Sequence, residues 1–233
     1  PSWTNLSNPK RDADDMANIL ESKYGFKISR LHNRSSDEVV TALIELKRSL
    51  QPRDKVLIFI AGHGHYDEDY GTGFLVFNDG ASLKAEKPYK TYLSLSTLRN
   101  IIDPFPSDHV FLVLDVCFGG QFDINEDDIR LSHYALAERD LSLQEWMLNK
   151  DTTYHSRIFL ASGTGEVPDY WSNSLRHSPF ASKLLHALKE EDEFFSPGKL
   201  FLYTEGNITA PVLKQFGRHD TRGDFLIPVV SQP

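Results

Sequence analysis

The chain contains a single cysteine among 233 residues, so it has no internal disulfide. A reducing, cytoplasmic setting is the simpler expectation, and a mature exported enzyme with a lone catalytic thiol is the alternative. No run approaches the roughly 18 consecutive apolar residues of a membrane span. The formal charge of -8 argues against a general nucleic-acid binder, which would carry a basic patch. The sequence also lacks an initiator methionine and a signal pattern, so it is read as a trimmed or processed chain.

What is present fits one α/β domain over residues 1–233, with 40% hydrophobic and 25% charged residues. Short apolar runs predict strands buried on both faces of a parallel sheet, at 56–61, 74–77, 110–114 and 158–161. Helical spacing and caps predict helices at 12–24, 35–50, 94–102, 141–148, 178–190 and 210–216. Less buried strands are predicted at 26–31 and 224–227. This alternation predicts a three-layer α/β/α sandwich with a mostly parallel sheet.

Two of the buried-strand signals end in reactive-looking loops. One is followed by Gly62-His63-Gly64-His65, and the other by Asp115-Val116-Cys117-Phe118-Gly119-Gly120. Ligands of open α/β sheets bind beyond the carboxyl ends of the strands, so a histidine and a cysteine placed there would share one cleft. A thiol, an imidazole and glycine-rich backbone N–H groups are the parts that nucleophilic catalysis needs.

These motifs resemble the caspase and metacaspase superfamily. The caspase signature places a Cys-x-Gly core about 50 residues after the catalytic histidine, and here Cys117-Phe118-Gly119 follows His63 by 54 positions (117 minus 63). The first helix, Ser178-Pro179-Phe180 and the segment 223–226 extend the resemblance over nearly the whole chain. The first strand of the family's fold is expected to be missing here.

The resemblance implies a cysteine endopeptidase acting on protein or peptide substrates without a cofactor. Cys117 would attack the scissile carbonyl and form a thioester, and His63 would act as base and later as acid. The backbone N–H groups of Gly64 and Cys117 would form the oxyanion hole.

Asp115 stands where caspases place glutamine, and there the chain is similar to metacaspases and paracaspases, whose acid favours a basic P1 residue. A carboxylate at the pocket floor attracts a cation and repels aspartate. Glu166 is a second candidate acid of this S1 pocket, with an ordinary solvated carboxylate as the alternative. The sequence therefore predicts cleavage after Arg or Lys.

Two other functions are alternatives to a cysteine endopeptidase. A catalytically silent caspase-fold interaction domain is the runner-up. His63, His65 and Asp67 form a more remote alternative as a metal-dependent hydrolase site, although no second ligand cluster accompanies them. The acidic runs at 67–69 and 125–128 leave calcium activation open without assigned ligands. Regulatory domains or partners would lie outside this chain.

The segment over about 121–156 is a candidate processing linker. It contains Arg130, Arg139 and Lys150 in stretches expected to be exposed. If the S1 pocket prefers basic residues, self-cleavage after one of them is predicted.

Overall fold

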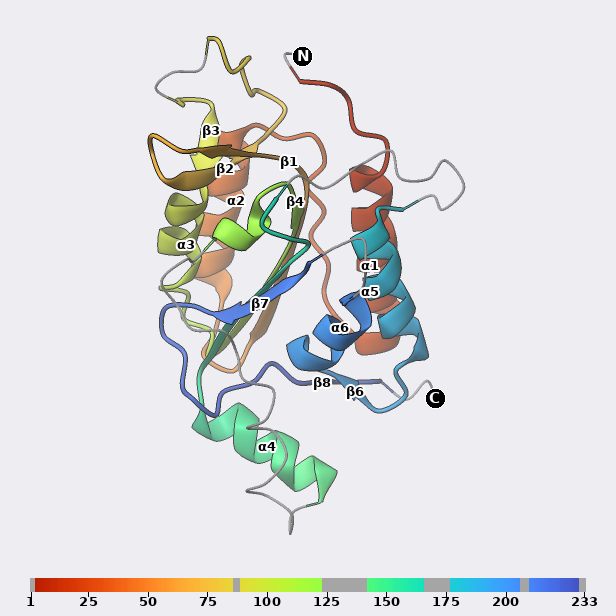
Figure 1. Cartoon of the computed structure of the whole chain (residues 1–233). Coiled ribbons are helices and arrows are strands. Elements are labelled where there is room, and N and C mark those ends of the chain that lie inside the picture. The colour runs from red at the N-terminus through yellow and green to blue at the C-terminus, as the bar shows by residue number, and fades with distance from the viewer. Residues whose placement is uncertain (1–2, 86–88, 123–141, 166–176, 206–209, 231–233) are drawn as a thin grey trace.

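A computed structural model describes residues 3–85, 89–122, 142–165, 177–205 and 210–230. Its centre is a six-stranded sheet (Figure 1). The strand order is β3 (Tyr92–Ser94), β2 (Thr72–Val76), β1 (Lys55–Asp67), β4 (His109–Val116), β5 (Ser156–Ala161) and β7 (Val212–Gln215). The β1–β4 and β4–β5 pairs are parallel, and the other three pairs are antiparallel. Strands β3, β1, β4 and β5 therefore run in one direction, which confirms the mostly parallel sheet.

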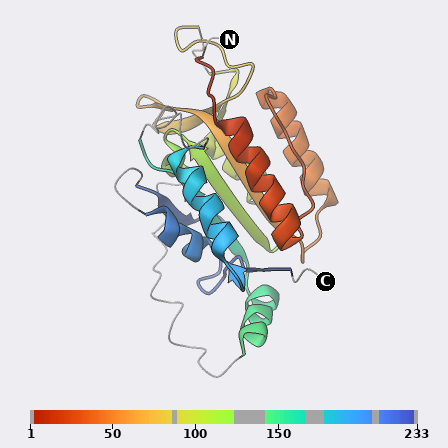
Figure 2. The same cartoon turned by 90° about the vertical axis from the view of Figure 1, so that its right-hand side faces the viewer.

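Helices cover both faces of this sheet (Figures 1 and 2). One face carries α1 (Pro9–Tyr24), α5 (Pro179–Glu190) and α6 (Pro197–Thr204), and the other carries α2 (Ser36–Ser49) and α3 (Leu95–Ile102). Each layer buries its own apolar cluster against the sheet. The three-layer sandwich predicted from the sequence is confirmed. Among the described residues, no helix is long and apolar enough to cross a membrane.

Alternating residues of the central strands divide between the two faces. Leu57 and Phe59 of β1 pack in the α1–α5 cluster, whereas Val56, Ile58 and Ile60 pack in the α2–α3 cluster. Because the side chains of a strand alternate with a period of two, the later odd-numbered residues of β1 continue on the α1–α5 face. Every residue of β4 is buried, as its uninterrupted apolar run predicts.

Three predicted elements are wrong. Residues 210–216 have apolar residues at helical spacing, but the chain there forms β7, antiparallel to β5, because pairing to an open sheet edge outweighs the local pattern. Residues 26–31 form no strand; Phe26 and Ile28 instead pack against the α1–α5 cluster. The last strand is β8 (Ile227–Pro228), which pairs with β6 (Phe194–Phe195) rather than extending over 224–227.

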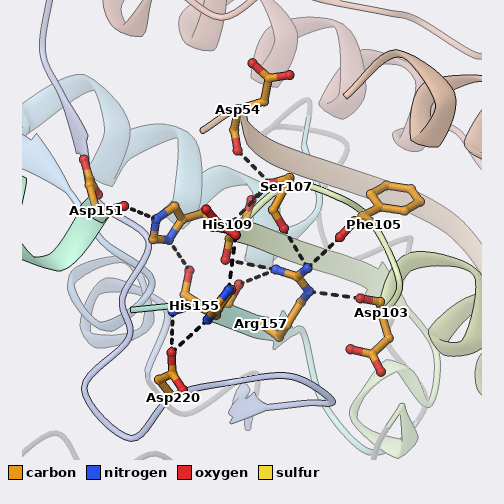
Figure 3. Close-up of polar contacts among 11 residues, drawn as sticks. Asp54, Asp103, Phe105, Ser107, His109, Asp151, His155, Arg157 and Asp220 are labelled. Carbon is orange, nitrogen blue, oxygen red and sulfur yellow. Dashed lines mark hydrogen bonds and ion pairs between the residues drawn. The ribbon is translucent and has the colours of Figure 1, made fainter. Parts of the chain in front are cut away.

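A buried arginine of β5 joins this strand to the segment between α3 and β4 (Figure 3). The Arg157 side chain is 0% exposed, and all five of its N–H groups can be used. They donate over 2.7–3.3 Å to the backbone carbonyls of Asp103, Phe105, Ser107, Asp108 and Ser156. Burial lowers the pKa of Arg157 to about 10, so the guanidinium remains charged at neutral pH.

A second polar cluster holds α4 (Leu143–Thr153) against the same end of the sheet. Lys55 Nζ lies 2.5 Å from Asp151 Oδ2 and donates to the Leu226 carbonyl, and Lys150 Nζ donates to the Arg222 carbonyl at 3.0 Å. Asp224 is fully buried beside them, and its Oδ2 has no hydrogen-bond partner among the described residues. Burial raises the pKa of this carboxyl to about 7.

We expect Arg157→Met to destabilise the fold strongly, because five hydrogen bonds to backbone carbonyls would be lost. Of these carbonyls, that of Asp108 keeps a second donor, Ser156 N. The free energy of unfolding in urea should fall by about 3 kcal/mol or more. Arg53 is exposed, and Arg53→Met, the matched control, should change it by less than about 0.5 kcal/mol. Equal effects of the two substitutions would contradict a structural role for the buried guanidinium.

Asp224 should make stability depend on pH. The folded protein keeps a proton that the unfolded chain loses above its ordinary pKa of 3.8, so this group's contribution falls as pH rises toward about 7 and then levels off. The free energy of unfolding in urea should therefore rise for Asp224→Asn, relative to the original protein, as the pH is raised from about 4 to about 8. The exposed-site variant Asp69→Asn serves as the control. A difference for Asp224→Asn that stays constant with pH would contradict the expectation.

Candidate active site

His63 lies within β1, just past the part that pairs with β4, and Cys117 directly follows β4. The last β1–β4 pair is Gly62 with Val116, so the next residue of each strand is the predicted base and the predicted nucleophile. His63 and Asp115 are odd-numbered and so lie on the α1–α5 face of the sheet, in line with Phe59 and Val113. The loop predicted at 62–65 is wrong, because these residues continue β1 and pair with β2, but the structure does place the histidine segment beside the cysteine turn.

Gly64 sets how closely these loops approach. A Cβ atom at this position would lie 1.9 Å from the Cys117 carbonyl oxygen and 3.2 Å from the Cys117 backbone nitrogen. No side chain larger than hydrogen fits such a gap, so glycine is required here by the neighbouring backbone rather than by its own dihedral angles. The backbones of the histidine loop and of the cysteine turn are in direct contact.

The His63 imidazole is held from the segment that precedes α1. Its Nε2 lies 2.6 Å from the Thr4 carbonyl oxygen. A carbonyl can only accept, so this contact requires the proton on Nε2 and leaves Nδ1 as the nitrogen that can take a further proton. The Trp3 indole packs against the same imidazole, with 5.1 Å between ring centroids.

Cys117 opens a tight turn after β4. The next residue, Phe118, has a φ of 59°, in the left-handed region that a non-glycine residue rarely adopts. Backbone hydrogen bonds hold this conformation: Phe118 N donates to the Gly165 carbonyl at 2.9 Å, and Gly120 N donates to the Gly163 carbonyl at 2.8 Å. The loop after β5 thus supports the turn, and the Cys117 residue remains partly exposed.

Asp115 belongs to a buried network that joins β4, α1 and α5. Its Oδ2 accepts a hydrogen bond of 2.5 Å from Ser178 Oγ, while Ser178 N donates to Asp12 Oδ2 at 3.2 Å. Asp12 is 1% exposed, and its Oδ1 lies 2.6 Å from His177 Nδ1. Ser178 is also the N-cap of α5, so both carboxylates lie near the positive end of a helix dipole.

Sequence reasoning missed Asp12, Thr4 and Trp3. Asp12 is spaced four residues before Met16 and eight before Leu20, both buried on the same side of α1. An acid on an apolar stripe was therefore a usable signal, because isolated buried carboxylates are rare. Thr4 acts through its backbone carbonyl and Trp3 through a long-range contact, so neither carries a local signal. Glu166, the second acid predicted for the S1 pocket, lies outside the described residues.

His65 and Asp67 have structural surroundings of their own. The His65 ring packs near Tyr89 and Tyr92, with centroid distances of 5.9 and 6.4 Å. Asp67 is buried, accepts from Tyr70 N at 3.0 Å and is hydrogen-bonded to the Tyr89 hydroxyl. Across the part of the chain that the structure describes, no three His, Cys, Asp or Glu side chains converge as a metal site. The acidic run at 125–128 lies outside that part.

Comparison with known proteins places this site in a family context. A family model described as the caspase domain matches residues 1–212. Among solved structures, protein GSU0716 from Geobacter sulfurreducens shares 17% identity over 93% of this chain and 86% of its own, with a TM-score of 0.60. Caspase-1 from Spodoptera frugiperda shares 15% identity over 93% of this chain and 81% of its own, with a TM-score of 0.55. A search of curated proteins finds no match.

Gly64→Ala should force the two loops apart, because the added methyl would overlap the Cys117 carbonyl. We expect the free energy of unfolding to fall by about 2 kcal/mol or more. Gly165 offers a matched control, since a Cβ there would meet nothing within 4 Å. Gly165→Ala should leave stability within about 0.5 kcal/mol of the original value. If denaturant unfolding showed Gly64→Ala to be as stable as Gly165→Ala, the close approach of the loops would be wrong.

Proposed function

The chain belongs to the caspase-domain family, and on this premise we propose that it is a cysteine endopeptidase that cleaves after Arg or Lys. Cys117 is the proposed nucleophile and His63 the proposed general base. The observation that carries the proposal is the contact of Gly64 with the Cys117 backbone, because it holds the histidine segment of β1 against the turn that contains Cys117.

The proposed reaction proceeds in two halves. Cys117 Sγ attacks the scissile carbonyl after its proton passes to His63, and the C–N bond breaks as His63 returns a proton to the departing amine. A thioester remains on Cys117. Water then attacks this thioester with His63 as base, the C–S bond breaks, and the acid product leaves with the thiol restored. The Thr4 carbonyl supports this role by orienting the imidazole.

Backbone N–H groups are the proposed stabilisers of the oxyanion. In each tetrahedral intermediate a negative charge develops on the former carbonyl oxygen, and preorganised N–H donors lower its energy. We assign these donors to Gly64 and Cys117, whose backbones are in contact. The turn that contains Cys117 is held by hydrogen bonds to the loop after β5, so its N–H direction does not depend on substrate.

The proposed S1 pocket takes its selectivity from Asp115 and Asp12. Both carboxylates are nearly fully buried and are joined through Ser178. Two acids in one neighbourhood favour the cationic side chain of Arg or Lys and repel the carboxylate of an Asp side chain. Asp12 takes a place in this proposal beside Glu166, which keeps its sequence-based assignment.

The structure bears on where self-cleavage would occur. Lys150 lies within α4, is 7% exposed and donates to the Arg222 carbonyl. A peptidase binds its substrate in extended form, so cleavage there would require this helix to unfold. Arg130 and Arg139 lie outside the described residues and remain the proposed sites of autoprocessing.

A fluorogenic peptide panel that varies only P1 tests the proposal. We expect turnover with Arg and Lys, none with Asp, and complete loss in Cys117→Ala. The panel is run with and without calcium, and a peptidyl chloromethyl ketone ending in Arg should label only Cys117. Turnover restricted to Asp would overturn the specificity. Absence of both turnover and labelling would favour a silent interaction domain.

Asp115→Asn should reduce kcat/KM for Arg substrates by about 100-fold, because it removes the charge while keeping an oxygen for Ser178. Asp69→Asn is the matched control, since it removes the same charge from an exposed turn. Steady-state kinetics with Arg and uncharged P1 residues should show the loss for Arg alone. An equal loss with every substrate would mean that Asp115 maintains the site without selecting P1.

A further inference from the structure

Trp3 is fixed beside the catalytic loops by contacts that the proposed reaction does not use. Its indole Nε1 lies 3.1 Å from the Ala81 carbonyl oxygen and 3.0 Å from the Tyr92 hydroxyl. Its ring centroid lies 5.1 Å from that of His63 and 6.0 Å from that of Tyr92. The side chain packs against the aromatic cluster of β2 and β3 yet is only partly buried. The indole is therefore anchored at its polar edge, and Trp3 as a residue is only partly buried.

The indole lies over a row of residues that leads away from the nucleophile. His63 pairs with Val76, and Val76 pairs with Tyr92, so the three form one cross-strand row over β1, β2 and β3. The carboxylate network lies on the opposite side of His63, because Asp115 is on β4 and the sheet order is β3-β2-β1-β4. The base thus stands between the proposed S1 pocket and Trp3.

The role of His63 as acid indicates on which side of it the leaving group of the substrate would lie. A group that protonates the departing amine lies on the leaving-group side of the scissile bond. The residue that follows the cleaved bond, P1′, must therefore leave past His63, away from the acids that hold P1. Trp3 is the partly exposed aromatic side chain that packs on that side of the imidazole.

We propose that Trp3 forms an S1′ subsite that selects apolar, preferably aromatic, P1′ residues, an inference that rests on the proposed peptidase function. The indole N–H is already used by Ala81 and Tyr92, so a side chain that docks on Trp3 would meet the aromatic ring rather than a polar group. Val76 and Tyr92 beneath it are buried. An aromatic side chain gains more from stacking on such a surface than a small or polar one.

Acyl transfer measures this subsite separately from the cleavage step. A peptide ester ending in Arg acylates Cys117 and releases its alcohol, and an added amine then competes with water for the thioester. In transfer, the amine nitrogen bonds to the acyl carbon, the C–S bond breaks, and the amine's proton passes through His63 to the thiolate. The amine enters from the leaving-group side, so an amino-acid amide occupies S1′.

We expect phenylalaninamide to give a ratio of transfer to hydrolysis roughly 3- to 10-fold higher than glycinamide does. Trp3→Ala should remove this preference, and Trp3→Phe should retain most of it. The ratio compares two fates of one acyl-enzyme, so a general loss of His63 efficiency largely cancels. Leu202, 57% exposed on α6, supplies the control, and Leu202→Ala should leave the ratio unchanged.

The outcomes separate the two proposals. If the ester releases its alcohol and the two amides give equal ratios, or if Trp3→Ala keeps the preference, the S1′ assignment is wrong while the peptidase stands. If neither the original protein nor any variant releases alcohol from Arg, Lys or Asp esters, the proposed function fails and the S1′ subsite fails with it.

Discussion

The contact between two backbones at one edge of the sheet is the constraint on which the candidate site depends. Gly64 lies so close to the Cys117 carbonyl that only a hydrogen atom fits between them. Parallel pairing of β1 with β4 brings the histidine segment of β1 beside the cysteine turn, and the glycine then sets their separation. The geometry of the site thus depends on the register of β1 with β4 and on the absence of a side chain at Gly64.

The order of strands across the sheet divides the site into two sides. Asp115 on β4 is joined through Ser178 to Asp12 on α1, which places two buried carboxyl groups on one side of His63 and Cys117. Trp3 and the aromatic residues of β2 and β3 lie on the other side. In the proposed peptidase reaction, a substrate crossing from β4 toward β3 would meet the buried acids first and the aromatic surface after the scissile bond.

The polar groups buried at the opposite end of the same sheet have a structural role. Arg157 of β5 donates to four carbonyls of the segment before β4 and to that of Ser156, and Lys55 joins β1 to α4 and to the Leu226 carbonyl. These contacts hold the amino ends of the strands in place. Register at that end determines register at the carboxyl ends, so the buried cations support the site from across the domain.

The sequence by itself determined the buried strands and both helical layers, and it nominated His63 and Cys117 as the candidate pair, because each rests on a local pattern or a short motif. Only the tertiary structure decided what lies around that pair. Asp12 and Thr4 reach the site from 105 or more positions before Cys117 (117 minus 12), through contacts that no local spacing encodes. The segment 210–216 shows the same limit: its helical spacing was real, but an open edge of β5 made it a strand. A sequence pattern reports only on residues that are near in the chain, whereas the surroundings of the site and the strand β7 depend on residues that are near only in space.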